Sequence, residues 1–125
     1  MEDKLKRLPD AELEVMQVLW NLEPPVPRAT AEAEMQKLRP MAQTTLLTLL
    51  TRLSEKGFVR IEKQGRSSVY TPLISQEDYQ ARQSRRFVDQ LFGGSMSAFA
   101  SALTASGIPR EDLDELRRLL EEGKL

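Results

Sequence analysis

Apolar residues recur at helical spacing in two segments near the start of the chain. The first segment begins at Asp10, which is placed to cap it, and ends before Pro24-Pro25. A short extended piece is expected at residues 26–28. A second helix follows, with Thr30 as its expected cap and an end near Leu38. The chain therefore opens with two helices.

A third helix is indicated from Ala42 to about Lys56, where Gly57 is placed to end it. One face carries leucines at helical spacing: Leu46, Leu49, Leu50 and Leu53. The other face is unusual because it carries short polar side chains where helix propensity favours Glu and Lys. These residues are Gln43, Thr44, Thr45, Thr48 and Arg52.

The pattern then changes from helical spacing to alternation. Residues 58–73 predict a β-hairpin with Gly65 at its turn and Arg66 near its tip. Ser75 is placed to cap a long helix that runs through Phe92. The order of elements is three helices, a hairpin and then another helix.

A helical tail follows the paired glycines at 93–94, with an apolar segment and a last helix that opens at Pro109. Its apolar residues are too many for one thin tail to hide against a small domain, so we expect a dimer interface. The candidates are Phe87, Leu91, Phe92, Phe99, Leu103, Leu113, Leu116 and Leu120.

The order of elements predicts a mainly α protein with a small β-hairpin wing, that is, a winged helix-turn-helix with a C-terminal helical dimerisation tail. We place the DNA-binding domain at residues 1–74 and the dimerisation region at 75–125. In such a fold the polar third helix enters the major groove of double-stranded DNA, and Arg52 contacts a base or a phosphate. Further phosphate contacts are expected from Lys56, Lys63 and Arg66.

The composition argues against an enzyme, because the chain has no Cys and no His. Thiolate and imidazole chemistry, disulfides and the common zinc sites are thereby excluded. We expect no cofactor and no metal. No apolar run approaches the roughly 20 residues that span a bilayer, and no signal peptide is visible, so we expect a cytoplasmic protein without membrane insertion.

The net charge of −1 hides an uneven distribution along the chain. Residues 41–87 carry 8 basic and 4 acidic side chains, whereas both flanks are negative. A locally basic middle is what a phosphate-binding face requires.

Three stretches of the sequence together resemble one family of bacterial transcription regulators. They are the segments that begin Leu8-Pro-Asp-Ala-Glu-Leu-Glu-Val-Met, Thr44-Thr-Leu-Leu-Thr-Leu-Leu-Thr-Arg-Leu and Tyr70-Thr-Pro-Leu. They resemble the penicillinase repressor family, the BlaI/MecI group, over nearly the whole chain. The resemblance implies a homodimeric repressor that binds a palindromic operator.

The resemblance also implies release from DNA when a membrane sensor metalloprotease triggers cleavage of the tail. Cleaved relatives have an Asn-Phe bond where this chain has Ser101-Ala102. This candidate cleavage region leaves two routes of release open, a differently tuned protease and another signal. A second departure is Leu47, at a position where relatives carry basic residues.

Two other functions fit the same pattern of elements. One is a MarR-like regulator that responds to a small ligand. The other is a winged-helix protein-interaction module without DNA affinity, which the near-neutral net charge and Leu47 favour.

Overall fold

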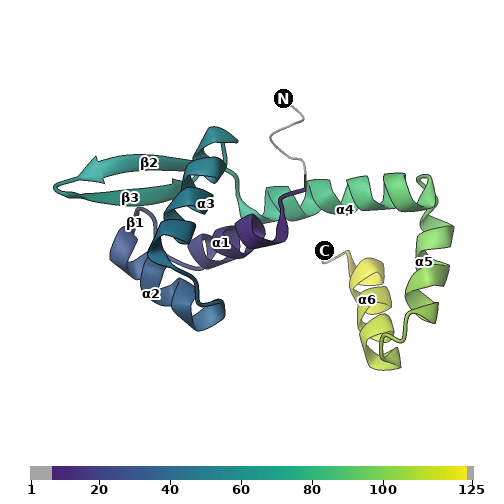
Figure 1. Ribbon diagram of the computed structural model, residues 1–125. Helices are drawn as coiled ribbons and strands as arrows, with labels where there is room; N and C mark the ends of the chain where they lie inside the picture. The colour runs from purple at the N-terminus through teal and green to yellow at the C-terminus, as the bar shows by residue number, and fades with distance from the viewer. Residues whose placement is uncertain (1–6, 124–125) are drawn as a thin grey trace. The chain divides into compact units, whose positions relative to one another are not determined.

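The computed structural model describes residues 7–123, which form helices and a small antiparallel sheet (Figure 1). By its internal contacts the chain divides into two units, of which one ends at Gln83 and the other begins at Ser84. The division falls inside a continuous helix, α4 (Gln76–Phe92). The sequence predicts a functional boundary between residues 74 and 75, and that boundary remains a prediction.

The first unit has the order of elements that the sequence predicts. Its elements are α1 (Asp10–Trp20), β1 (Val26–Pro27), α2 (Arg28–Leu38), α3 (Gln43–Glu55), β2 (Val59–Gln64), β3 (Ser67–Pro72) and the first part of α4 (Gln76–Phe92). The strands lie in the order β1-β3-β2, and both pairs are antiparallel. Tyr70 in the middle strand pairs with Val26 on one side and Ile61 on the other.

The two longer strands form the predicted hairpin, which Figure 1 shows extending away from α1, α2 and α3. Their register pairs Gln64 with Ser67, so Gly65 and Arg66 make a two-residue turn. Gly65 has a φ of 67°, which glycine adopts without steric cost and which such tight turns require.

Two predicted helix caps are wrong. Pro9 precedes α1 as its cap, so Asp10 is the first helical residue, and Pro27 caps α2, so Thr30 lies inside that helix. Each proline has φ near −60° and an extended ψ, the conformation that a residue before a helix needs. Because the proline ring already fixes φ, it enters the helix at little entropic cost.

The core of the first unit lies between the three N-terminal helices and the sheet. The four leucines of α3 face it, as predicted, and pack with side chains of α1 and α2 and with the aromatic ring of Phe58. The buried apolar residues around these leucines include Val15, Met16, Leu19, Ala31 and Met35. This packing fixes which face of α3 is left outside.

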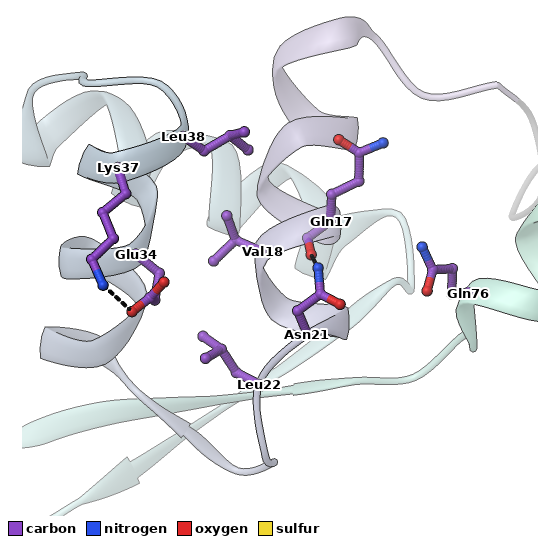
Figure 2. Close-up of a pocket in the computed structure, with 8 residues that line it drawn as sticks. All are labelled: Gln17, Val18, Asn21, Leu22, Glu34, Lys37, Leu38 and Gln76. Atoms are coloured by element: carbon purple, nitrogen blue, oxygen red, sulfur yellow. Dashed lines mark hydrogen bonds and ion pairs between the residues drawn. The ribbon is translucent and has the colours of Figure 1, made fainter.

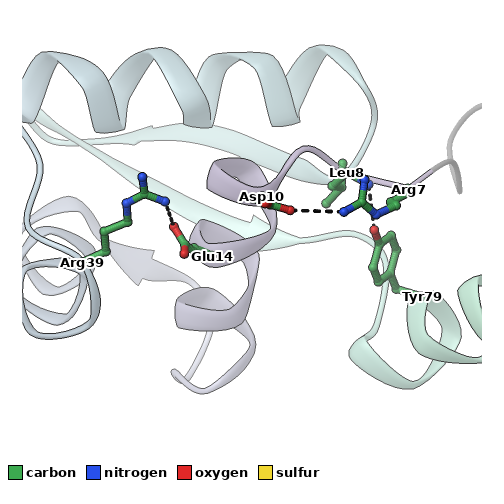
Figure 3. A network of polar contacts seen from close by, with 6 residues as sticks. All are labelled: Arg7, Leu8, Asp10, Glu14, Arg39 and Tyr79. Atoms are coloured by element: carbon green, nitrogen blue, oxygen red, sulfur yellow. Dashed lines mark hydrogen bonds and ion pairs between the residues drawn. The ribbon is translucent and has the colours of Figure 1, made fainter. Parts of the chain in front are cut away.

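Aromatic packing and two hydrogen bonds join the start of α4 to the same core. Tyr79 packs against Trp20 and Phe58, with ring centroids 5.8 Å away in each case. Its hydroxyl accepts a hydrogen bond from the buried backbone N–H of Leu8 at 2.8 Å (Figure 3). The indole N–H of Trp20 donates to the carbonyl of Ile74 at 2.9 Å. The first turns of α4 are therefore part of the N-terminal unit.

The second unit contains the end of α4 and two further helices, α5 (Met96–Ala105) and α6 (Arg110–Glu122). Gly93 and Gly94, both with positive φ, separate α4 from α5. The Ser95 hydroxyl caps α5 by accepting from the Ala98 N–H at 3.0 Å. Neither α5 nor α6 contains a buried residue within the part of the chain that is described.

Candidate nucleic-acid interface

The surface of α3 turned away from the leucine stripe is exposed along its whole length. Thr44, Thr48, Thr51 and Glu55 follow one another at intervals of four, three and four residues, and all four are exposed. This spacing places them in one row on the helix. We refer to these four residues as the exposed face of α3.

Two threonine hydroxyls of this face donate within the helix itself. Thr48 Oγ1 donates to the carbonyl of Thr44, and Thr51 Oγ1 donates to the carbonyl of Leu47, both at 2.9 Å. Since each hydroxyl has a single hydrogen, these side chains offer a ligand only oxygen lone pairs and a methyl group. The exposed face of α3 thus accepts hydrogen bonds more readily than it donates them.

The N-terminus of α3 is open to a ligand. Its capping residue is Ala42, which provides no side-chain hydrogen bond, and no acidic residue lies in the first turn. The first backbone N–H groups of a helix have no partner within it, and the helix dipole favours an anion there. A phosphate is the kind of anion that such an end binds.

Arg52 stands beside the exposed face of α3 and is itself exposed. Within residues 7–123 it makes no ion pair at 4.0 Å or less. Its guanidinium is therefore available for the two parallel hydrogen bonds that arginine makes with guanine or phosphate.

Lys56 has a different environment from the one that the sequence suggests. Its ammonium lies 2.5 Å from Glu12 Oε1, and the Glu12 side chain is only 4% exposed. Glu12 is the one buried charged residue in the described part of the chain. Lys56 thus ties the end of α3 to α1, and a phosphate contact by Lys56 stays a prediction.

The hairpin carries the other predicted cations. Lys63 and Arg66 are exposed, and neither forms an ion pair with any residue that the structure describes. Arg60 differs, since it pairs with Glu62 at 3.5 Å. The free charges of the hairpin are therefore at and near its turn.

The remaining predicted residues, Gln43 and Thr45, are exposed but lie off this row. Gln43 lines a hollow that Ala29, Glu32 and Gln36 of α2 also line. Sequence reasoning missed Thr51 and Glu55, although the interval of three or four residues from Thr44 and Thr48 marks both. Glu55 brings a carboxylate into the row.

Burial shifts the pKa of one side chain in the sheet, that of Tyr70. Desolvation raises the pKa of the Tyr70 hydroxyl above its ordinary value, and the nearby positive charge of Arg28 opposes this. The Tyr70 side chain is therefore uncharged at neutral pH and packs in the hydrophobic core.

The residues predicted for an interface lie in the second unit, and several expose large apolar surfaces. Leu91 is 63% exposed, Leu120 60% and Phe87 50%. Phe87, Phe92 and Phe99 pack edge to face, with centroids 5.6 to 6.4 Å apart. The other predicted residues, Leu103, Leu113 and Leu116, are half-buried or exposed. Ser101 and Ala102 are exposed within α5.

A second concavity, of about 600 Å³, lies between α1, α2 and the first residue of α4 (Figure 2). Val18, Leu22 and Leu38 give it apolar walls, and Lys37 pairs with Glu34 at 3.1 Å along its rim. It shares no residue with the exposed face of α3.

No helix in residues 7–123 is long and apolar enough to cross a membrane. The same residues contain no group of three or more acidic side chains arranged to hold a metal ion.

Known proteins resemble this chain along almost all of its length. Residues 8–122 match the family model described as Penicillinase repressor. A penicillinase repressor of Bacillus licheniformis is 33% identical over 122 residues, which cover 97% of this chain and 94% of that protein. The methicillin resistance regulatory protein MecI of Staphylococcus aureus strain N315 is 27% identical over 123 residues, covering 98% and 99%.

Two solved structures share the fold of the N-terminal unit. One is the DNA-binding domain of the repressor BlaI in solution, with a TM-score of 0.53. The other is the monomeric form of Bacillus licheniformis BlaI in complex with the blaP half-operator, with a TM-score of 0.51. Each is 37% identical to this chain and covers 60% of it and 90% of the solved chain.

These similarities confirm the predicted winged helix-turn-helix and the prediction of a regulator rather than an enzyme. They also separate the chain from the MarR-like regulators. The chain belongs to the penicillinase repressor family and is a DNA-binding transcriptional repressor.

Proposed function

We propose that the protein acts as a homodimer on a palindromic operator, and that each protomer reads one half-site with the exposed face of α3. The observation that carries this proposal is the row of exposed polar side chains opposite the buried leucines of the same helix. The packing of those leucines against α1 and α2 holds the row outward. A major groove about 12 Å wide admits one such helix.

Each part of the surface has its own role in this proposal. Thr48 and its neighbours contact base edges, and Arg52 supplies a bidentate contact to guanine. Lys63 and Arg66 contact phosphates beside the groove, which sets affinity without selecting a sequence. The open N-terminus of α3 fits a further phosphate. The relative bound to half an operator as a monomer supports this division, one protomer to a half-site.

Dimerisation would come from the second unit. Its exposed apolar side chains, above all Leu91, Leu116 and Leu120, favour burial against an identical surface. Two half-sites centred about 34–36 Å apart are then bound by one molecule, so the second protomer binds at a high effective concentration. We propose the cytoplasm as the compartment, because the DNA partner lies there.

Release from the operator would follow a weakening of the dimer. The segment around Ser101 and Ala102 has small, exposed side chains and little packing to hold it, so it is open to a protease when the helix frays. A membrane sensor metalloprotease tuned to this sequence is the partner that we propose. Truncation after Leu103 should mimic the cut and release the operator, whereas unchanged binding would point to another signal.

The direct test is DNA binding as a function of salt. A duplex selected by the protein from a pool of random sequences would be compared with a scrambled duplex by fluorescence anisotropy. We expect tighter binding of the selected duplex, a palindromic sequence, and a linear fall of log K with log salt concentration. Equal affinity for the two duplexes would contradict the reading of an operator sequence, and absence of binding to either duplex would favour the protein-interaction module.

A further inference from the structure

Leu47 is a half-buried leucine next to the exposed polar face of α3. One side of it packs against the hydrophobic core. The rest lines a shallow hollow of about 370 Å³ with Thr48, Thr51, Arg52 and Glu55. An apolar group thus borders the row of polar side chains that we propose for base contacts.

The hydrogen-bonding groups around Leu47 limit which chemical groups of DNA can bind in this hollow. The hydroxyls of Thr48 and Thr51 already donate their hydrogens to backbone carbonyls, and Glu55 ends in a carboxylate. Apart from Arg52, the side chains that line the hollow with Leu47 present oxygen acceptors and methyl groups. A guanine edge, which offers only acceptors in the major groove, is therefore a poor partner for Leu47, Thr48 and Thr51.

The major groove presents a single apolar group, the C5-methyl of thymine. We propose that Leu47, together with the threonine methyl groups beside it, packs against the C5-methyl of one thymine in each half-site. Leu47 is then a specificity-determining residue. This inference rests on the proposed function, because it requires α3 to lie in the major groove.

The test removes the methyl group from the DNA rather than from the protein. In the duplex selected by the protein, each thymine of a half-site would be replaced in turn by deoxyuridine, which keeps every hydrogen-bonding group. We expect one position at which the replacement weakens binding about fourfold, because the complex loses the burial of one methyl group. The other positions should bind within experimental error of the parent duplex.

Protein variants then show whether Leu47 causes the loss of affinity at the sensitive position. Leu47→Ala should bind the parent duplex more weakly and show no further loss at the sensitive position. Leu38→Ala is the matched control, since Leu38 is an exposed leucine of α2 outside this surface, and it should keep the fourfold loss. Leu47→Met, which keeps an apolar side chain of similar volume, should keep most of it.

Two results would overturn the inference. One is a half-site with no position sensitive to deoxyuridine, and the other is a Leu47→Ala variant that loses as much as the parent at the sensitive position. In both cases the selected duplex is still bound with salt-dependent preference, so the proposed function stands. If the selection enriches no sequence, the proposed function itself fails, and this inference fails with it.

Discussion

At the scale of single residues, the structure separates cations that look alike in the sequence. Lys56, Lys63 and Arg66 all follow the polar helix or lie in the hairpin, and the pattern predicts one role for the three. Only a tertiary contact distinguishes them: Lys56 forms an ion pair with Glu12, which lies 44 positions away in the chain. Pairings at such separation have no local signal, which is why sequence reasoning missed this one.

The ion pair predicts that Lys56 contributes more to stability than to DNA affinity. Lys56→Ala leaves the Glu12 carboxylate buried without its partner, and we expect a loss of about 1–3 kcal/mol in the free energy of unfolding. Lys63→Ala should change stability by less than about 0.5 kcal/mol. Urea titrations of the two variants measure both values.

The same two variants should respond to salt in the opposite order. Lys63→Ala should lower the slope of log K against log salt concentration by about 1, the share of one phosphate contact. Lys56→Ala should leave the slope as in the parent protein. A lowered slope with unchanged stability in Lys56→Ala would show that its ammonium contacts DNA instead of Glu12.

At the scale of the elements, periodicity predicts the helices and the hairpin well, while their ends depend on finer chemistry. The leucine stripe of α3 and the alternation of residues 58–73 each follow from one strong pattern. The sequence predicts the caps of α1 and α2 wrongly, because Asp10 and Thr30 are good capping residues that each follow a proline within three positions. The proline determines where each helix begins, because its ring fixes φ before the helix forms.

The contact between Tyr79 and Leu8 predicts how strongly α4 is held to the N-terminal unit. Tyr79→Phe keeps the ring between Trp20 and Phe58 but leaves the buried N–H of Leu8 without an acceptor. We expect a loss of about 1–3 kcal/mol in the free energy of unfolding. Gln80→Ala, an exposed neighbour on α4, is the control and should stay within about 0.5 kcal/mol of the parent. Equal stability of all three proteins would contradict this account of the helix.

At the scale of the whole molecule, the sequence predicts a surplus of apolar residues in the tail, and their exposure agrees with it. Leu116 and Leu120 lie four residues apart on α6, where no residue is buried. The sequence does not predict which surface covers them, because the same apolar spacing on a helix serves burial within one chain and burial between chains. Measurements of the oligomeric state answer that question.

We expect the substitution of both leucines to separate the dimer. In the variant Leu116→Gln with Leu120→Gln, sedimentation at micromolar concentration should show a monomer or a much weaker dimer, because the apolar area available for burial is lost. Glu115→Gln with Glu121→Gln changes the same number of residues on the same helix and should remain dimeric. A parent protein that sediments as a monomer would exclude dimerisation through the tail.

The central claim is that α3 selects the sequence while the hairpin supplies affinity for any DNA. The most direct measurement is the ratio of affinities for the selected and the scrambled duplex, determined for Arg52→Ala and for Arg66→Ala. We predict that Arg52→Ala lowers this ratio about 5- to 150-fold, the effect of ~1–3 kcal/mol from one good base contact. Arg66→Ala should weaken both duplexes alike and leave the ratio unchanged. An unchanged ratio in Arg52→Ala, or a ratio lowered only by Arg66→Ala, would contradict the account.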